Sequence, residues 1–174
     1  RNKERRNKKF MTHQKRLSAP KHYPISKKEN TYISTVKGSR SKDQAIPANV
    51  FLRDVTGYAE TDQEARKIVK NGDILRNGER LRDEKQGIGA LDVVQLPKAE
   101  ENYRVIRNGD NLDFLTTEDT RKAAKITGKT LQSESEKVYQ LHNGENHTST
   151  DNFTTGSTLI FQEDDSVEEV KLEE

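Results

Sequence analysis

The sequence predicts an α+β fold in three parts, and three observations predict it. Residues 1–28 carry eleven Lys/Arg against one acid, so residues 1–45 are expected to form an extended basic arm. Two helical patterns followed by a hairpin signal predict a small helix–helix–hairpin module over residues 46–97. Short alternating or apolar runs over residues 98–174 predict an antiparallel, β-rich, barrel-like domain with an acidic C-terminus.

Composition bounds what the 174 residues can do. Hydrophobic residues are 29% and charged residues 34%, so much of the chain should be solvated rather than buried in a core. The absence of cysteine excludes disulfides and thiolate metal sites and fits a reducing compartment. No run approaches the roughly 20 apolar residues of a membrane span, and the basic N-terminus lacks the apolar core of a signal peptide. No membrane partner is expected.

The net charge of +2 hides an asymmetry, because the chain after residue 28 holds 20 Lys/Arg and 28 Asp/Glu. The block 1–9 is expected to be disordered without a partner. Residues 11–25 mix cations with prolines and rings, which favours an extended strap over the alternative of a flexible tail. In that strap Lys15, Arg16 and Lys21 would meet phosphates, and His22 and Tyr23 would stack or wedge.

The module begins with a helix predicted over residues 47–56. Proline suits a first helical turn, and Gly57 is placed to end the helix. The side chains of Val50, Phe51 and Val55 would form its buried face.

A second helix is predicted over residues 61–71. Thr61 and Glu64 can form a capping box, and Gly72 stands where a left-handed residue ends a helix. Three apolar residues then share one stripe and three cations the opposite face. The stripe is Ala65, Ile68 and Val69, and the cations are Arg66, Lys67 and Lys70.

Strands dominate the rest of the prediction. Asn77-Gly78 and Asn108-Gly109 each separate two strand-like runs, which is the strongest local signal for a hairpin. Acids in a first turn favour one short helix over residues 117–125. The remaining strands are expected at 91–96, 103–107, 112–115, 138–142, 157–161 and 167–172.

Four short motifs in the module resemble the RNA-binding module named after bacterial small-subunit ribosomal protein S-four. That module also occurs in pseudouridine synthases, aminoacyl-tRNA synthetases and heat-shock proteins. The motifs are Leu52-Arg53-Asp54-Val55, Glu64-Ala65-Arg66-Lys67-Ile68-Val69, Gly72-Asp73-Ile74-Leu75 and Asn77-Gly78.

The flanking segments are similar to the archaeal and eukaryotic ribosomal protein family S-four-e, in order from about residue 12 to the end. They are His13-Gln14-Lys15-Arg16-Leu17-Ser18-Ala19-Pro20-Lys21, Leu91-Asp92-Val93-Val94 and Asn102-Tyr103-Arg104-Val105.

The sequence departs from that family pattern in four places. Tyr23 stands where the family's arm has tryptophan, and residues 1–10 are extra length. Asp62-Gln63 replaces the usual Ser-Arg start of the second helix, which puts a contact there in doubt. The family also ends in a small SH3-like barrel with a KOW motif. The sequence offers no candidate for it, and we expect the chain to stop before it.

The resemblance implies a structural constituent of the small ribosomal subunit, located on cytoplasmic ribosomes, that binds rRNA directly. Its partners would be small-subunit rRNA and neighbouring ribosomal proteins, with no cofactor and no small-molecule substrate. The alternatives are an RNA-binding accessory subunit of an RNA-modifying enzyme and a free RNA-binding regulator. The expected RNA contacts are Lys15, Arg16, Lys21, His22, Tyr23, Arg53, Arg66, Lys67, Lys70, Arg76, Arg80 and Arg82.

Neither catalysis nor a metal site is expected. His142 and His147 bracket Glu145, but Gly144 makes this segment a turn and no further ligands complete a site. The sequence contains no Gly-x-Ser-x-Gly elbow and no phosphate-cradling glycine-rich loop.

Overall fold

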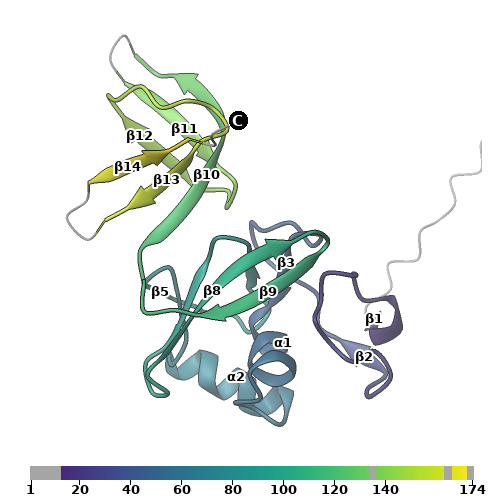
Figure 1. The fold of residues 1–174 in the computed structure, drawn as a ribbon. Helices are drawn as coiled ribbons and strands as arrows, with labels where there is room; N and C mark the ends of the chain where they lie inside the picture. The colour runs from purple at the N-terminus through teal and green to yellow at the C-terminus, as the bar shows by residue number, and fades with distance from the viewer. Residues whose placement is uncertain (1–12, 134–135, 163–165, 172–174) are drawn as a thin grey trace, which may run out of the picture.

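A computed structural model describes residues 13–133, 136–162 and 166–171. The predicted disordered block 1–9 and the acidic residues 163–165 lie outside the described residues. Two five-stranded antiparallel sheets dominate the fold, one in the module and one in a C-terminal β domain that follows it along the chain (Figure 1). Two short helices, α1 (Ala48–Val50) and α2 (Asp62–Asn71), belong to the module, so the α+β class is confirmed.

The module sheet has the strand order β5-β4-β7-β8-β9. The boundary predicted between residues 97 and 98 falls inside this sheet, between the hydrogen-bonded strands β7 (Val93–Leu96) and β8 (Glu101–Asn108). The module of the structure therefore comprises residues 46–116, and the β domain comprises the residues that follow. A separate pair, β3 (Ala45–Pro47) with β6 (Gly87–Gly89), adjoins it. The five strands are β4 (Leu75–Arg76), β5 (Glu79–Arg80), β7 (Val93–Leu96), β8 (Glu101–Asn108) and β9 (Asn111–Thr116).

The first predicted helix is present but divided. Pro47 is extended and ends β3, and α1 (Ala48–Val50) continues into a π-helical segment, η2 (Phe51–Val55). Phe51 is fully buried against the rings of Tyr103 and Phe114, at centroid distances of 5.6 and 5.1 Å. Helix and sheet thus share one hydrophobic core.

The second helix, α2 (Asp62–Asn71), forms as its sequence predicts. Both hydrogen bonds of the Thr61–Glu64 capping box are present, and Gly72 closes the helix at φ 80°. Ala65 and Val69 are buried, whereas Ile68 is only half-buried at the edge of the core. The apolar stripe is therefore narrower than the sequence pattern suggests.

The arm is where the structure differs most from expectation. From residue 13 onward the segment is folded against the module rather than extended: β1 (Gln14–Lys15) pairs with β2 (Tyr32–Ile33) around the 3-10 turn η1 (Arg16–Ser18). Tyr23 and Ile33 join the module core. Apolar side chains spaced along residues 13–45 allow this segment to pack on the module core. The high charge density of the segment hides this pattern in the sequence.

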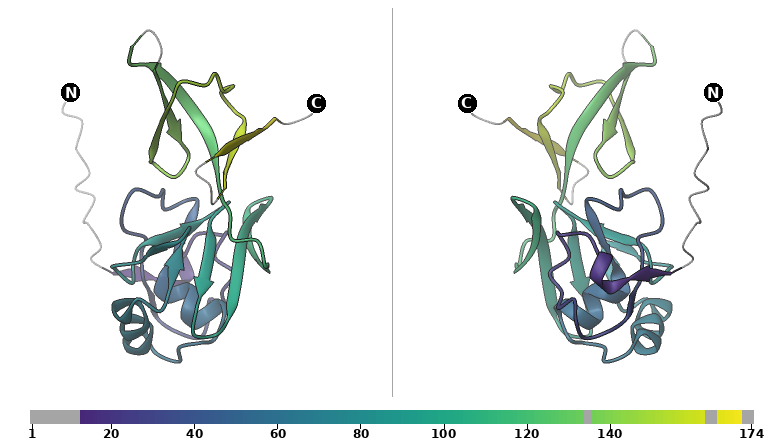
Figure 2. Two further views of the ribbon diagram at one scale, coloured as in Figure 1. Left: turned by 90° about the vertical axis from the view of Figure 1, so that its left-hand side faces the viewer. Right: turned by 90° about the vertical axis from the view of Figure 1, so that its right-hand side faces the viewer.

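The C-terminal β domain is a curled sheet of order β12-β11-β10-β13-β14, seen from two sides in Figure 2. The central strand, β10 (Lys122–Leu131), pairs with β13 over its first residues and with β11 over its last residues. A second, smaller core lies here, around Tyr139 and Leu159. The strands are β10 (Lys122–Leu131), β11 (Lys137–Leu141), β12 (Asn146–Ser149), β13 (Thr158–Phe161) and β14 (Val167–Val170).

The short helix predicted over residues 117–125 is wrong. Lys122–Lys125 form the start of β10 and pair with β13, which buries Ala124. The acid that suggested a first helical turn shapes a loop instead, because the Asp119 carboxylate accepts hydrogen bonds from the backbone and guanidinium of Arg121. Strand pairing outweighs a weak local helix signal here.

Candidate nucleic-acid interface

Eleven of the twelve side chains predicted to contact RNA fall into three groups in the structure, and Arg76 stands apart. One group is buried in the folded arm, one is held in ion pairs, and one is exposed without an ionic partner. The distinction matters because a phosphate oxygen competes poorly for a cation that is already buried and paired.

Arg16, His22 and Tyr23 are buried. The Arg16 Nη2 atom lies 2.6 Å from Asp54 Oδ1, and its Nε donates to the Ser26 carbonyl at 2.5 Å. His22 Nε2 lies 3.1 Å from the Ala45 carbonyl, and burial raises the pKa of Tyr23. These three residues stabilise the fold of residues 13–45, in place of the phosphate contacts and stacking expected of an extended strap.

Arg53 and Arg66 carry ionic partners. The Arg53 guanidinium contacts Asp54 at 2.7 Å and Asp62 at 2.6 Å, and only 14% of its side chain is exposed. Arg66 Nη2 lies 3.0 Å from Glu84 Oε1. Asp62, which departs from the family pattern, thus forms an ion pair with Arg53.

The exposed group is Lys15, Lys21, Lys67, Lys70, Arg80 and Arg82. None of them forms an ion pair with any residue that the structure describes. Arg76, the remaining member, is half-buried and donates from Nη1 to the Gly87 carbonyl at 2.6 Å. Four of these seven cations converge on one place.

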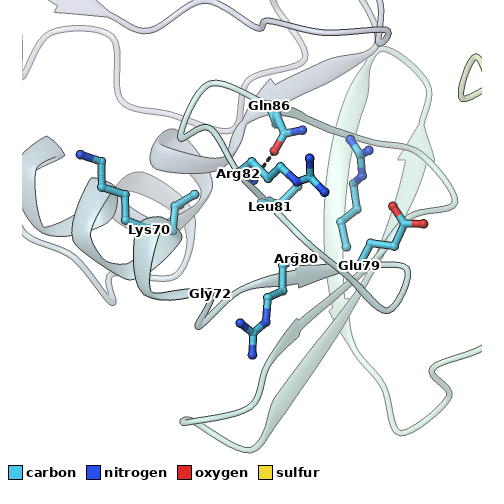
Figure 3. Close-up of a pocket in the computed structure, with 9 residues that line it drawn as sticks. Lys70, Gly72, Glu79, Arg80, Leu81, Arg82 and Gln86 are labelled. Atoms are coloured by element: carbon cyan, nitrogen blue, oxygen red, sulfur yellow. Dashed lines mark hydrogen bonds between the residues drawn. The ribbon is translucent and has the colours of Figure 1, made fainter.

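That place is an open cavity of about 820 Å³ between the C-terminal end of α2 and the β4–β5 hairpin (Figure 3). We call it the hairpin cavity. Glu79 is the one acid among its lining residues. The cations that line it are Lys70, Arg76, Arg80 and Arg82.

The end of α2 holds one of these cations in place. A Cβ atom on Gly72 would lie 3.0 Å from Arg80 Cδ and 3.3 Å from its Cζ, so the Arg80 side chain crosses directly over this glycine. The free carbonyls at a helix C-terminus carry partial negative charge, which favours a guanidinium there. Gly72 is thus required twice, for its positive φ and for this close approach.

Gln86 is a residue of the cavity that the sequence does not single out. Its Oε1 accepts from the backbone N–H groups of Arg82 and Asp83, at 2.6 and 3.2 Å, and so shapes the loop that carries Arg82. The pKa of Asp83 is lowered, chiefly by a hydrogen bond from the Lys85 backbone N–H. No sequence signal marks Gln86, because its role depends on the folded loop.

The histidine segment of the β domain does not form a metal site among the residues that the structure covers, where no group of three or more potential ligands gathers. His142 and His147 each have a pKa lowered mainly by burial, and both belong to the fold of that domain. Within the same described ranges, no helix has the length and apolarity to cross a membrane.

The chain is similar to known ribosomal proteins. Residues 11–38 match the family model described as RS4NT (NUC023) domain. The small ribosomal subunit protein eS4 of Archaeoglobus fulgidus is 34% identical over 93% of this chain and 71% of its own length. The protein of the same name from Natronomonas pharaonis is 34% identical over 76% of this chain and 58% of its own length.

A solved structure supports the fold. The crystal structure of 30S ribosomal protein S4e from Thermoplasma acidophilum matches with a TM-score of 0.62 at 23% identity, over 75% of this chain and 70% of that one. The relatives are ribosomal proteins, which are structural components and not enzymes, so the prediction of a non-enzyme is confirmed. The chain therefore belongs to the family of small ribosomal subunit protein eS4.

Proposed function

We propose that the chain is a structural constituent of the small ribosomal subunit and that it binds small-subunit rRNA directly through the hairpin cavity. The observation that carries this proposal is that Lys70, Arg76, Arg80 and Arg82 line one cavity. Family membership supports the ribosomal setting, although the chain spans only 58% to 71% of the two eS4 proteins compared above.

The cations would act mainly through phosphate. Within the described part of the chain, no carboxylate pairs with Lys70, Arg80 or Arg82. Each can therefore approach a backbone phosphate without breaking an ion pair. Phosphate contacts supply affinity and fix orientation, whereas the shape of a folded RNA supplies specificity. Lys15, Lys21 and Lys67 are exposed and would extend the same contact surface.

Two other cations predicted to touch RNA take a different role in this proposal. Their first role would be to stabilise α2, Arg53 through its ion pair with Asp62 and Arg66 through its ion pair with Glu84. Surface pairs of this kind contribute about 0–1 kcal/mol, so Arg66 can exchange its carboxylate for a phosphate at small cost. Arg53, which is mostly buried, is the less available of the two.

The proposal is tested by binding of the full chain to a small-subunit rRNA fragment across a range of salt concentrations. Replacing Lys70, Arg80 and Arg82 together with Gln should lower the log–log salt slope by about 2–3 units, since each phosphate contact accounts for about 0.7–0.9. The matched control replaces three β-domain cations, Lys129, Lys137 and Lys171, with Gln. Equal slopes for the parent and the cavity variant would contradict the proposal.

Sedimentation of the chain with small ribosomal subunits separates the alternatives. An integral constituent should stay with the particle through a moderate-salt wash, because many contacts must break together. A free RNA-binding regulator or an accessory subunit of a modifying enzyme should be released. Release of the chain at moderate salt, with rRNA-fragment binding intact, would favour those alternatives.

A further inference from the structure

A second cavity, of about 450 Å³, lies where the module meets the β domain. We call it the junction cavity. The folded arm contributes Arg40 and Gln44 to its lining, and the module contributes Ala90, Leu91 and Arg107. The β domain contributes Lys125, Thr127 and His142.

Direct contacts beside this cavity connect the two parts of the fold. His142 Nε2 lies 3.0 Å from the Ala90 carbonyl, while its Nδ1 accepts from the Lys125 backbone N–H at 3.1 Å. The hydroxyl of Ser39 donates to the Asn143 carbonyl at 3.2 Å. Away from the cavity, Arg104 also contacts Asp119 and Arg121. The two hydrophobic cores are separate, so polar contacts such as these connect the two parts.

The charges around the junction cavity do not cancel. Arg40 is neutralised by the buried Asp92, with which it forms an ion pair, and Glu145 is neutralised by Lys122 at 2.5 Å. His142 is neutral in this arrangement, because Nδ1 accepts a hydrogen bond and burial lowers its pKa. Two cations remain, Arg107 from the module and Lys125 from the β domain, and neither pairs with an acid among the described residues.

We propose that the junction cavity binds a phosphate group of the RNA backbone between Arg107 and Lys125, and that this contact fixes the β domain relative to the module. The inference rests on the proposed function, because it takes the same RNA as its ligand. A phosphate bridging one cation from each part would gain from both charges only when the two parts are correctly oriented.

RNA is a better occupant than an acidic peptide because of what lies next to the cavity. Arg76 lines the hairpin cavity and donates to the Gly87 carbonyl at 2.6 Å, and Arg40 of the junction cavity packs against the same glycine. The two cavities therefore lie close together. An RNA backbone carries a phosphate at every nucleotide, so one strand would supply an anion to both cavities at once.

The test is binding of the full chain to the small-subunit rRNA fragment after replacing Arg107 and Lys125 with Gln. The affinity should fall about ten-fold at physiological salt, and the salt slope should fall by about one unit, because the bridging phosphate is no longer neutralised. The matched control, Lys137→Gln with Lys171→Gln, removes two β-domain charges that do not line this cavity and should bind like the parent. If the cavity variant binds as the control does, this inference is overturned while the proposed function stands.

A second readout reports on orientation. Because the chain has no cysteine, Glu60→Cys in the module and Thr150→Cys in the β domain can carry a pair of fluorescent dyes. The distribution of energy-transfer efficiencies should narrow when RNA binds the parent and stay broad for the Arg107 and Lys125 variant. An equally narrow distribution for both would overturn the inference.

Free inorganic phosphate and a polyglutamate peptide distinguish the sources of the anion. Phosphate should shift the Lys125 and His142 amide NMR signals saturably in the parent and not in the variant. Polyglutamate that binds the parent more tightly than RNA, and loses that binding in the variant, would overturn the assignment to RNA. A parent chain that binds no RNA would overturn both the proposed function and this inference.

Discussion

The module and the C-terminal β domain are both antiparallel sheets, yet they differ in charge and in what their cations do. Residues 13–116 hold 19 Lys/Arg against 15 Asp/Glu, whereas residues 117–174 hold 6 against 13. In the module, Lys70, Arg80 and Arg82 gather at one cavity without ionic partners among the described residues. In the β domain, Arg121 and Lys122 pair with Asp119 and Glu145.

Net charge alone therefore does not locate an interface. The folded arm and the module together have an excess of only four positive charges, and several of their arginines are held in buried or half-buried ion pairs. Four of the remaining cations, Lys70, Arg76, Arg80 and Arg82, line one cavity, where they can raise the local affinity for phosphate. The β domain, with its acidic excess, suits contact with cationic protein neighbours.

The largest effect expected tests whether the two parts are independently stabilised. Phe51→Ala should cost about 3–5 kcal/mol of module stability, because it removes a fully buried ring that packs against two other rings. Amide hydrogen exchange should show reduced protection in β7 and β8 and unchanged protection in β10 and β13. Equal reduction in both sheets would show one cooperative unit and weaken the comparison.

Arg16→Met tests whether the arm residue is structural. Removing Arg16 leaves the buried carboxylate of Asp54 without one of its two arginine partners. Because Asp54 still pairs with Arg53, the loss of folding stability should be about 3 kcal/mol. Urea unfolding measures it, with exposed Lys15→Met as the control, which should stay within about 0.5 kcal/mol. Unchanged stability together with weaker RNA binding would restore Arg16 to the RNA-contact group.

The cap of α2 should have a smaller effect. Thr61→Ala removes the hydroxyl that accepts from the Glu64 backbone N–H and should cost about 1 kcal/mol. Gln63→Ala, at an exposed position of the same helix, is the control. Thermal unfolding of the two variants decides whether the capping box stabilises the helix that carries Lys70.

The smallest effect is a pH dependence in the β domain. Burial lowers the pKa of His142 in the folded chain below its ordinary value of about 6.5. The unfolded chain therefore binds the proton at higher pH, so this contribution to stability is complete above that value and is lost as pH falls toward the folded pKa. His142→Gln should therefore flatten the decline in unfolding midpoint below neutral pH. A parallel decline in the parent and the variant would contradict this prediction.

Local rules predicted the elements whose causes are local. The Thr61 cap and Gly72 bound α2 as expected, and Asn77 and Gly78 take the positive φ angles of 53° and 83° that their hairpin requires. The helix expected over 117–125 failed because Lys122–Lys125 pair with β13, a strand distant along the chain, which no local signal reports. Long-range pairing overrides weak propensity.

The site was predictable in part for the same reason. The sequence of α2 and of the hairpin identifies the cations. It does not show which of them form ion pairs with acids elsewhere in the chain. The partner of Arg16 is 38 residues away, and that of Arg66 lies in the loop at Glu84. Burial of His22 and Tyr23 likewise depends on the folding of residues 13–45 against the module.

If the hairpin cavity faces RNA and the acidic strand β14 faces protein or solvent, photo-crosslinking in the assembled small subunit should separate the two surfaces. A photoreactive amino acid would replace either Lys70, at the hairpin cavity, or Glu168, exposed on β14. We expect rRNA crosslinks from position 70 and only protein crosslinks, or none, from position 168. RNA crosslinks from position 168 with none from position 70 would contradict this expectation.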